Sequence, residues 1–265
     1  MSIQNKTSAI VTSFHNYCGG MDSMYFDVIF DYYISNFNKY WRDEVDHLYL
    51  LDSNWNIEID DPKITVIKTD PNDRYYDVYK KVLPGIKEGL IGFLDNDMVI
   101  MRKNIIKPIF DVLKMGKAGV CSIYDTCGTY KTDKLNGSNK FCPYFFFTSK
   151  DLLMNYLDCE WGPNLPEHET LGKLTELMLN DGVVPHEIEE DKTVKGKGLG
   201  YYHIRAGSST AYLLTTRNFG NKKTYDDYIK NQPDSETLRH ADWYEKMGGD
   251  SSQIKEDIRK KIQGN

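Results

Sequence analysis

The sequence predicts an α/β protein with a mostly parallel central sheet, flanking helices and a C-terminal helical extension. Short apolar runs alternate with segments of helical periodicity over the first hundred residues, which is typical of a parallel sheet covered by helices. These runs end in polar clusters at 15–16, 52–54, 69–74 and 95–97. Because ligands of open α/β sheets bind beyond the carboxyl ends of the strands, the clusters predict one shared binding site.

The first half of the chain gives the clearest elements. Strands are predicted at 8–14, 48–51, 64–67 and 90–94, and a helix over 75–88. Another helix is expected after the first strand, and its apolar face is formed by Met24, Phe26, Val28, Ile29, Tyr32 and Tyr33.

The second half is less regular. Strands are expected at 118–124, 144–148 and 201–205, and a loop at 128–140. Ser149 is expected to cap a helix that begins at Lys150, and a further amphipathic helix carries Leu171, Leu174, Leu177 and Met178. The expected organisation is one domain over 1–220, with a first half at 1–101 and a second half at 102–220, followed by a charged helical extension at 221–265.

Composition narrows the functional class. The 265 residues are 40% hydrophobic and 27% charged, which predicts a folded chain. A formal net charge of -6 argues against a nucleic-acid-binding protein. The five cysteines form no C-x-x-C pair, so free thiols in a reducing compartment are expected. The N-terminus lacks an apolar signal core and no apolar run reaches the ~20 residues of a membrane span, so we expect a cytoplasmic protein without a transmembrane segment.

The most informative motif is Asp95-Asn96-Asp97, which separates the apolar runs 90–94 and 98–101. Carboxylates are costly to bury unpaired, so a strong partner is expected at the end of this strand. A hard divalent cation with oxygen ligands is the natural candidate, and it would in turn hold a diphosphate. The sequence contains neither G-x-S-x-G nor G-x-x-x-x-G-K-[ST], which disfavours α/β-hydrolases and P-loop enzymes.

A D-x-D motif that follows a buried strand, with a histidine about 100 residues later, resembles the GT-A class of nucleotide-sugar glycosyltransferases over roughly residues 7–205. The resemblance implies a metal bound by Asp97 and by Asp95, which could instead contact the ribose and a metal-bound water. His203 would be a further ligand, and imidazole favours Mn²⁺ over Mg²⁺. The implied donor is a nucleoside diphosphate sugar, and UDP is expected because it is the commonest nucleotide in this class.

The resemblance also implies a GT-A-like (Rossmann-like) fold, in which 1–220 is a catalytic domain with a nucleotide-binding half at 1–101 and an acceptor half at 102–220. It assigns the nucleotide to the earlier strand ends. Thr12, Ser13 and Phe14 would line the base, and Asp52 would meet the base or the ribose. Basic residues would reach the base or the diphosphate, and those beside the glycine-rich loop 196–200 would clamp the diphosphate as the loop closes. These basic residues are Arg74 and Lys81, then Lys195, Lys197 and Arg205.

The acceptor side is less specific. The class usually carries an acidic residue at the start of a helix after the acceptor-site strands, where this chain has Glu167 and Glu169. In an inverting enzyme one of them would be the general base for the acceptor hydroxyl, and in a retaining enzyme a glutamate would lie under the anomeric carbon. The sequence reads Glu-His-Glu and not the inverting Glu-Asp, so the stereochemical outcome stays open. The acceptor, whether glycan, protein or lipid headgroup, is not revealed, and the C-terminal extension could form a homodimer contact.

Each assignment has a structural alternative. The acidic pair could be a polar turn, His203 a structural histidine, and the two glutamates ordinary acids in a first helical turn, where they favour the helix dipole. Two other functions also remain, a sugar-phosphate nucleotidyltransferase and a non-enzymatic nucleotide- or sugar-binding module. The nucleotidyltransferase is disfavoured because residues 15–20 contain none of the Arg or Lys expected in its first loop.

Overall fold

The computed structural model describes residues 6–14, 30–31, 33–96, 98–100, 102–125, 130–163, 167–188 and 201–203, with Ser252 and Glu256. The strands are β1 (Ser8–Phe14), β2 (His47–Asp52), β3 (Ile64–Lys68), β4 (Leu90–Leu94), β5 (Met98–Ile100), β6 (Val120–Asp125), β7 (Lys140–Ser149), β8 (Pro185–Glu187) and β9 (Tyr201–His203). The α-helices are α2 (Tyr75–Val82), α3 (Ile106–Lys114), α4 (Lys150–Met154) and α5 (Gly172–Asn180). A π-helix, η2 (Phe37–Trp41), and the 3₁₀ turns η3 (Arg42–Glu44), η4 (Leu83–Gly85) and η5 (Asp133–Leu135) complete the set.

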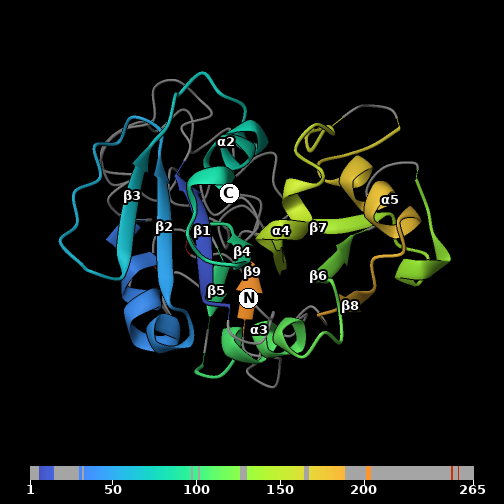
Figure 1. Cartoon of the computed structure of the whole chain (residues 1–265). Helices are drawn as coiled ribbons and strands as arrows, with labels where there is room; N and C mark the ends of the chain where they lie inside the picture. The colour runs from blue at the N-terminus through green and yellow to red at the C-terminus, as the bar shows by residue number, and fades with distance from the viewer. Residues whose placement is uncertain are drawn as a thin grey trace.

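Seven strands form one central sheet in the order β3-β2-β1-β4-β7-β6-β8 (Figure 1). The pairs β2–β3, β1–β2, β1–β4 and β6–β8 are parallel, whereas β7 runs antiparallel to both β4 and β6. The two predicted halves therefore meet in a single sheet at the β4–β7 pair. The expected α/β class with a mostly parallel central sheet and flanking helices is confirmed.

Apolar side chains cover both faces of this sheet, which makes three layers. One face packs against the 33–41 segment and α3, through Phe37, Trp41 and Phe110 among others. The other face packs against α2, α4 and α5, through residues such as Val78, Leu153 and Leu174. The seven residues of β1 are all buried because this central strand is covered on both faces.

A separate two-stranded sheet lies beside the main one. β5 pairs antiparallel with β9, so that Met98 faces His203 and Ile100 faces Tyr201 (Figure 1). Because β5 begins just after the Asp-x-Asp motif, this small sheet joins the motif to a segment far along the chain.

Two helices differ from their predicted limits. α2 ends at Val82 and not at residue 88, because Pro84 lies in the 3₁₀ turn that follows it. α5 begins only at Gly172, so Glu167 and Glu169 precede the helix and do not lie in its first turn. Leu171 adopts the left-handed conformation, with a φ of 63°, and thereby separates the two segments. The predicted cap at Ser149 is confirmed, since its hydroxyl accepts a hydrogen bond of 3.2 Å from Leu152 N.

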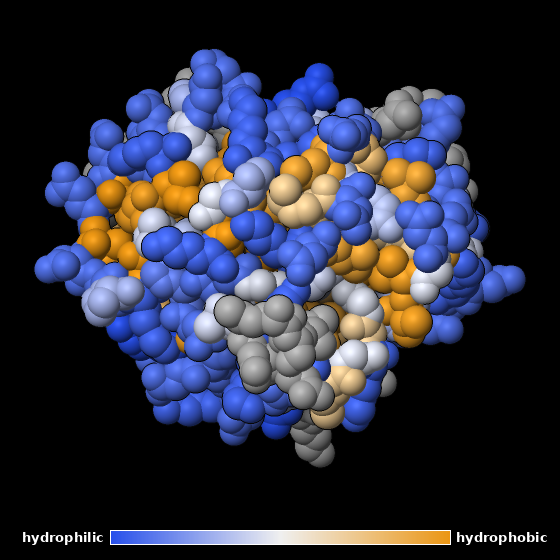
Figure 2. All heavy atoms as spheres, in the orientation of Figure 1, coloured by the Kyte–Doolittle hydropathy of each residue, from blue (hydrophilic) through white to orange (hydrophobic). Residues whose placement is uncertain are grey.

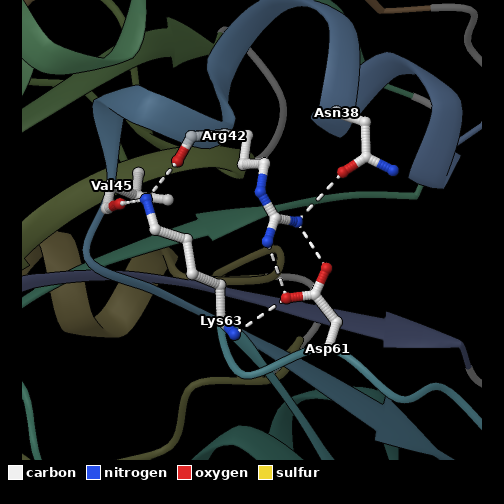
Figure 3. A network of polar contacts seen from close by, with 5 residues as sticks. All are labelled: Asn38, Arg42, Val45, Asp61 and Lys63. Carbon is white, nitrogen blue, oxygen red and sulfur yellow. Dashed lines mark hydrogen bonds and ion pairs between the residues drawn. The ribbon is translucent and has the colours of Figure 1, made fainter.

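An ion-pair network joins η3 to the loop before β3 (Figure 3). The Arg42 guanidinium donates two hydrogen bonds to the Asp61 carboxylate. One runs from Nη1 to Oδ2, and the other, of 2.8 Å, runs from Nη2 to Oδ1. Lys63 Nζ donates to the carbonyls of Arg42, at 2.8 Å, and Val45, at 3.1 Å. The hydrogen bonds from Arg42 hold the pKa of the Asp61 carboxyl below its usual value.

Several predicted features lie outside the described residues, namely the apolar helix positions up to residue 29, the loop at 196–200 and nearly all of the extension at 221–265. Within the part of the chain that is described, no helix is both long and apolar enough to cross a membrane.

Figure 2 shows one face of the molecule, where apolar residues form a broken band between hydrophilic ones.

Candidate functional site

The carboxyl ends of the parallel strands gather the candidate residues at one edge of the sheet. Neighbouring strands end there at Phe14, Asp52 and Leu94. The middle of antiparallel β7 lies at the same edge, because Asp95 N donates to Tyr144 O at 3.3 Å. Both predicted halves of the domain therefore contribute to the surroundings of the acidic motif.

A tight turn that begins at Asp95 and Asn96 connects β4 to β5. Met98 N donates to Asp95 O at 3.1 Å, which closes the turn. The Asn96 side chain donates to Ser13 O at 3.3 Å and so fastens the turn to the end of β1. Asp95 and Asn96 are half-buried, and Asp97 lies outside the described residues.

His203 is brought to this turn through the backbone. It stands opposite Met98 in the β5–β9 ladder, and opposite residues of an antiparallel pair have Cα atoms roughly 4.5–5.5 Å apart. The two predicted metal-binding segments are therefore neighbours in space. No three His, Cys, Asp or Glu side chains in the described part form a metal cluster, but that part excludes Asp97 and the side chain of His203.

The residues predicted to line the base have different surroundings. Thr12 is fully buried and its hydroxyl contacts that of Tyr33. Phe14 is buried in the core, with its ring centroid 5.5 Å from that of Tyr33. The Ser13 hydroxyl is buried and has no hydrogen-bond partner among the described residues. The end of β1 therefore supports the turn mainly through the Ser13 carbonyl.

Tyr33 lies close enough to the acidic turn for the Asp95 charge to act on its phenol. Burial raises the pKa of its phenol well above the usual value, and the Asp95 carboxylate raises it further, while the hydrogen bond with Thr12 opposes the rise. The phenol is therefore neutral at physiological pH and serves as a hydrogen-bonding group. Sequence reasoning placed Tyr33 only on an apolar helix face.

The Asp52 carboxylate, predicted to meet the base or ribose, is instead bound by other groups of the protein. Its two carboxylate oxygens accept from Trp55 N at 2.7 Å and Ile57 N at 2.8 Å. The fully buried carboxylate also pairs with Lys68 at 2.5 Å. These contacts stabilise the loop after β2.

The basic residues of α2 lie at the surface near the same edge. Arg74 is exposed just before the helix, with its guanidinium 3.5 Å from the Tyr76 hydroxyl. Lys81 forms an ion pair with Asp73. Each interaction raises the pKa of the basic group, so both remain charged. Lys197 and Arg205 lie outside the described residues.

The Glu-His-Glu segment is linked to strand β4 through Trp161. The Trp161 and Phe93 ring centroids are 6.2 Å apart, and Phe93 is two residues before Asp95. Leu171 N donates to Trp161 O at 2.7 Å, which ties the end of the segment to this tryptophan. Glu167 is exposed and Glu169 is half-buried.

His168 is a further titratable residue of this segment. In the sequence it stands out only as a departure from the Glu-Asp pattern. Its imidazole Nε2 lies 3.3 Å from Glu176 Oε2, although neither ring nitrogen has a well-formed hydrogen bond. The hydrogen bond from Lys173 lowers the pKa of Glu176, so this carboxylate is charged. A side chain at Gly172 would place its Cβ 2.9 Å from His168 Cβ, so the close approach requires glycine.

Comparisons with known proteins add little to this geometry. No protein-family model matches the chain, and no curated protein is similar to it in sequence. One similar solved structure is a nucleotidyl transferase from Methanothermobacter thermautotrophicus, 13% identical with a TM-score of 0.42 over 69% of this chain and 88% of that one. Another is a mannosyltransferase from Pyrobaculum calidifontis in complex with GDP-Man and Mn²⁺, 11% identical with a TM-score of 0.48 over 82% of this chain and 65% of that one. Likenesses this remote say nothing about substrate or chemistry.

Proposed function

We propose that the protein is a metal-dependent glycosyltransferase that moves a sugar from a nucleoside diphosphate sugar, with UDP as the expected base, to a hydroxyl acceptor. The β5–β9 pairing is the observation that carries this proposal. It brings His203 opposite Met98, directly after the acidic motif, at the carboxyl edge of an α/β sheet. A polar turn with only a structural role would not need a histidine-bearing strand from the far end of the domain beside it.

The donor atoms suit a divalent metal. Asp95 is half-buried at the end of β4, where a carboxylate can reach both the protein and a ligand. Asp95, Asp97 and His203 would hold the ion, and carboxylate oxygens with an imidazole suit Mn²⁺. The bound metal would stabilise the charge that develops on the departing nucleoside diphosphate.

Other residues of the chain have supporting roles in this proposal. Asn96 holds the turn against β1 through the Ser13 carbonyl. Glu167 or Glu169 would take the proton from the acceptor hydroxyl if the reaction inverts, or face the anomeric carbon if it retains. Their segment is linked through Trp161 to Phe93, near the acidic turn.

The test is thermal stability against nucleotides and nucleotide-sugars, each with and without Mn²⁺. A ligand at ~100 times its dissociation constant adds about 2.7 kcal/mol, a readily measured shift. We expect one nucleoside diphosphate to stabilise the protein only with Mn²⁺, and Asp97→Asn to abolish that shift and the turnover. Asp111→Asn, a surface carboxylate change in α3, is the matched control. Full activity of Asp97→Asn would defeat the proposal.

Product analysis separates the other functions. A glycosyltransferase releases a nucleoside diphosphate from its sugar donor, whereas pyrophosphate release from a nucleoside triphosphate would identify a nucleotidyltransferase. Binding without either product would identify a binding module. Glu167→Gln and Glu169→Gln should then be compared at saturating donor, and if neither lowers turnover more than a few-fold, neither is the base.

A further inference from the structure

We propose that the buried amide of Asn36 is a positioning residue, one that fixes the strand after the acidic turn and thereby sets the metal site. This inference rests on the proposed function, since it concerns the geometry of the same acidic motif. Asn36 lies in the segment before η2, far from the motif in the sequence.

The Asn36 side chain bonds the backbone of β5 in the way that a neighbouring strand would. Its Nδ2 donates to Ile100 O at 2.8 Å, and its Oδ1 accepts from Ile100 N at 3.2 Å. One amide thus satisfies both backbone groups of a residue that is itself fully buried. Without Asn36, the N–H and C=O groups of Ile100 would be buried without a hydrogen-bond partner, which would destabilise β5.

These bonds place Asn36 on the edge of β5 that faces away from β9. The backbone groups of one strand residue point to the same edge, and both groups of Ile100 are taken by Asn36. β9 pairs with β5 along the other edge. β5 is therefore held from both sides, by Asn36 and by the strand that carries His203.

A π-helix holds the Asn36 amide in place. Trp41 is the last residue of η2, and its indole Nε1 donates to Asn36 Oδ1 at 3.1 Å. The i→i+5 register of a π-helix brings positions five apart closer together than an α-helix does, and Arg42 N bonds Phe37 O in that register. Such π turns are rare and often occur at functional sites.

The consequence is a rigid connection from the core to the motif. Only Met98 and Val99 separate the acidic motif from Ile100, the residue that the Asn36 amide binds. Loss of the amide would free β5 to shift, and the backbone of Asp97 and the β5–β9 register would shift with it. Residues that orient metal ligands typically change metal affinity by ~10–100-fold when they are replaced.

The experiment is a Mn²⁺ titration of the nucleotide-free protein, followed by the electron paramagnetic resonance signal of free Mn²⁺. We expect Asn36→Leu to raise the dissociation constant of Mn²⁺ at least about tenfold. Trp41→Phe, which keeps an aromatic ring and removes the N–H donor, should raise the dissociation constant of Mn²⁺ by about threefold, since one hydrogen bond contributes modestly. Trp41→Phe also tests the positioning role if Asn36→Leu does not fold.

Thr148→Val is the control for a general loss of stability. It removes a buried hydrogen bond of 2.7 Å, from Thr148 Oγ1 to Gly119 O, at the other end of β7. This variant should bind Mn²⁺ like the parent protein even though it unfolds more easily. Equal weakening by Thr148→Val and Trp41→Phe would show that the effect is only one of stability.

The outcomes separate the two proposals. If Asp97→Asn loses Mn²⁺ binding while folded Asn36→Leu and Trp41→Phe keep it, the positioning role is wrong and the proposed function stands. If Asp97→Asn binds Mn²⁺ as tightly as the parent protein, the metal site is wrong and the positioning role fails with it.

Discussion

The N-terminus of α3 depends on a carboxylate from a distant segment, and its removal gives a quantitative test. Ile105, the residue before the helix, supplies no side-chain cap. Glu44, the last residue of η3, caps the helix instead. Its Oε2 accepts from Ile106 N at 2.7 Å and Lys107 N at 3.0 Å, and its Oε1 accepts from Asn104 N.

The expected cost follows from these contacts. Loss of a side-chain cap costs about 0.5–2 kcal/mol, and a charge at a helix N-terminus adds about 0.3–1 kcal/mol. Glu44 is half-buried, so water recovers part of the loss in the variant. We therefore expect Glu44→Ala to lower the free energy of unfolding by about 2 kcal/mol. Glu44→Gln keeps one acceptor oxygen and should cost about half of that.

Urea denaturation, followed by circular dichroism, measures this change, provided that the m-value stays constant. The control is Asp111→Asn, which breaks the exposed Lys107–Asp111 ion pair of 2.8 Å on the same helix. Such a pair contributes about 0.3–0.5 kcal/mol. If Glu44→Ala costs no more than Asp111→Asn, the carboxylate does not cap the helix and the reasoning is refuted.

Two further predictions concern pH and packing. The folded-state pKa of Asp61 is lowered by Arg42, so its stabilisation is fully present above the unfolded pKa of about 3.9 and is lost as the pH falls through the folded value. The difference in unfolding free energy between the parent protein and Asp61→Asn should be constant above about pH 5 and shrink below about pH 4, and a constant difference down to pH 3 would contradict this. Gly92→Ala should cost about 1–3 kcal/mol in urea denaturation, because the new Cβ would lie 2.5 Å from the Phe147 ring and 2.6 Å from Ile10 Cδ1. Gly85→Ala meets nothing within 4 Å and should be neutral, so equal costs for the two variants would argue against the clash.

Local patterns in the sequence determined much of the fold. β1 and β4 have the bounds that were predicted for them, because strands buried on both faces are rich in apolar residues. α3 was not predicted, although Ile106, Ile109, Phe110 and Leu113 recur at helical spacing and all are buried. That signal was present in the sequence.

Polar residues at the strand ends were harder to interpret. The sequence placed Asp52 at the correct edge of the sheet, but a buried carboxylate looks the same in sequence whether it binds a ligand or its own backbone. Only the folded chain brings Lys68 to Asp52, and the backbone N–H groups of Trp55 and Ile57 fill its oxygens. The position was predictable and the partners were not.

By itself, the sequence determined the α/β class, the central strands and the acidic motif at a strand end. The tertiary structure alone decided the antiparallel insertion of β7, the pairing of β5 with β9 and the grip of Asn36 on Ile100. The physical reason is that these features depend on hydrogen bonds between segments far apart in the chain. Such bonds use backbone groups that every residue possesses, so they leave no local pattern of side chains to read.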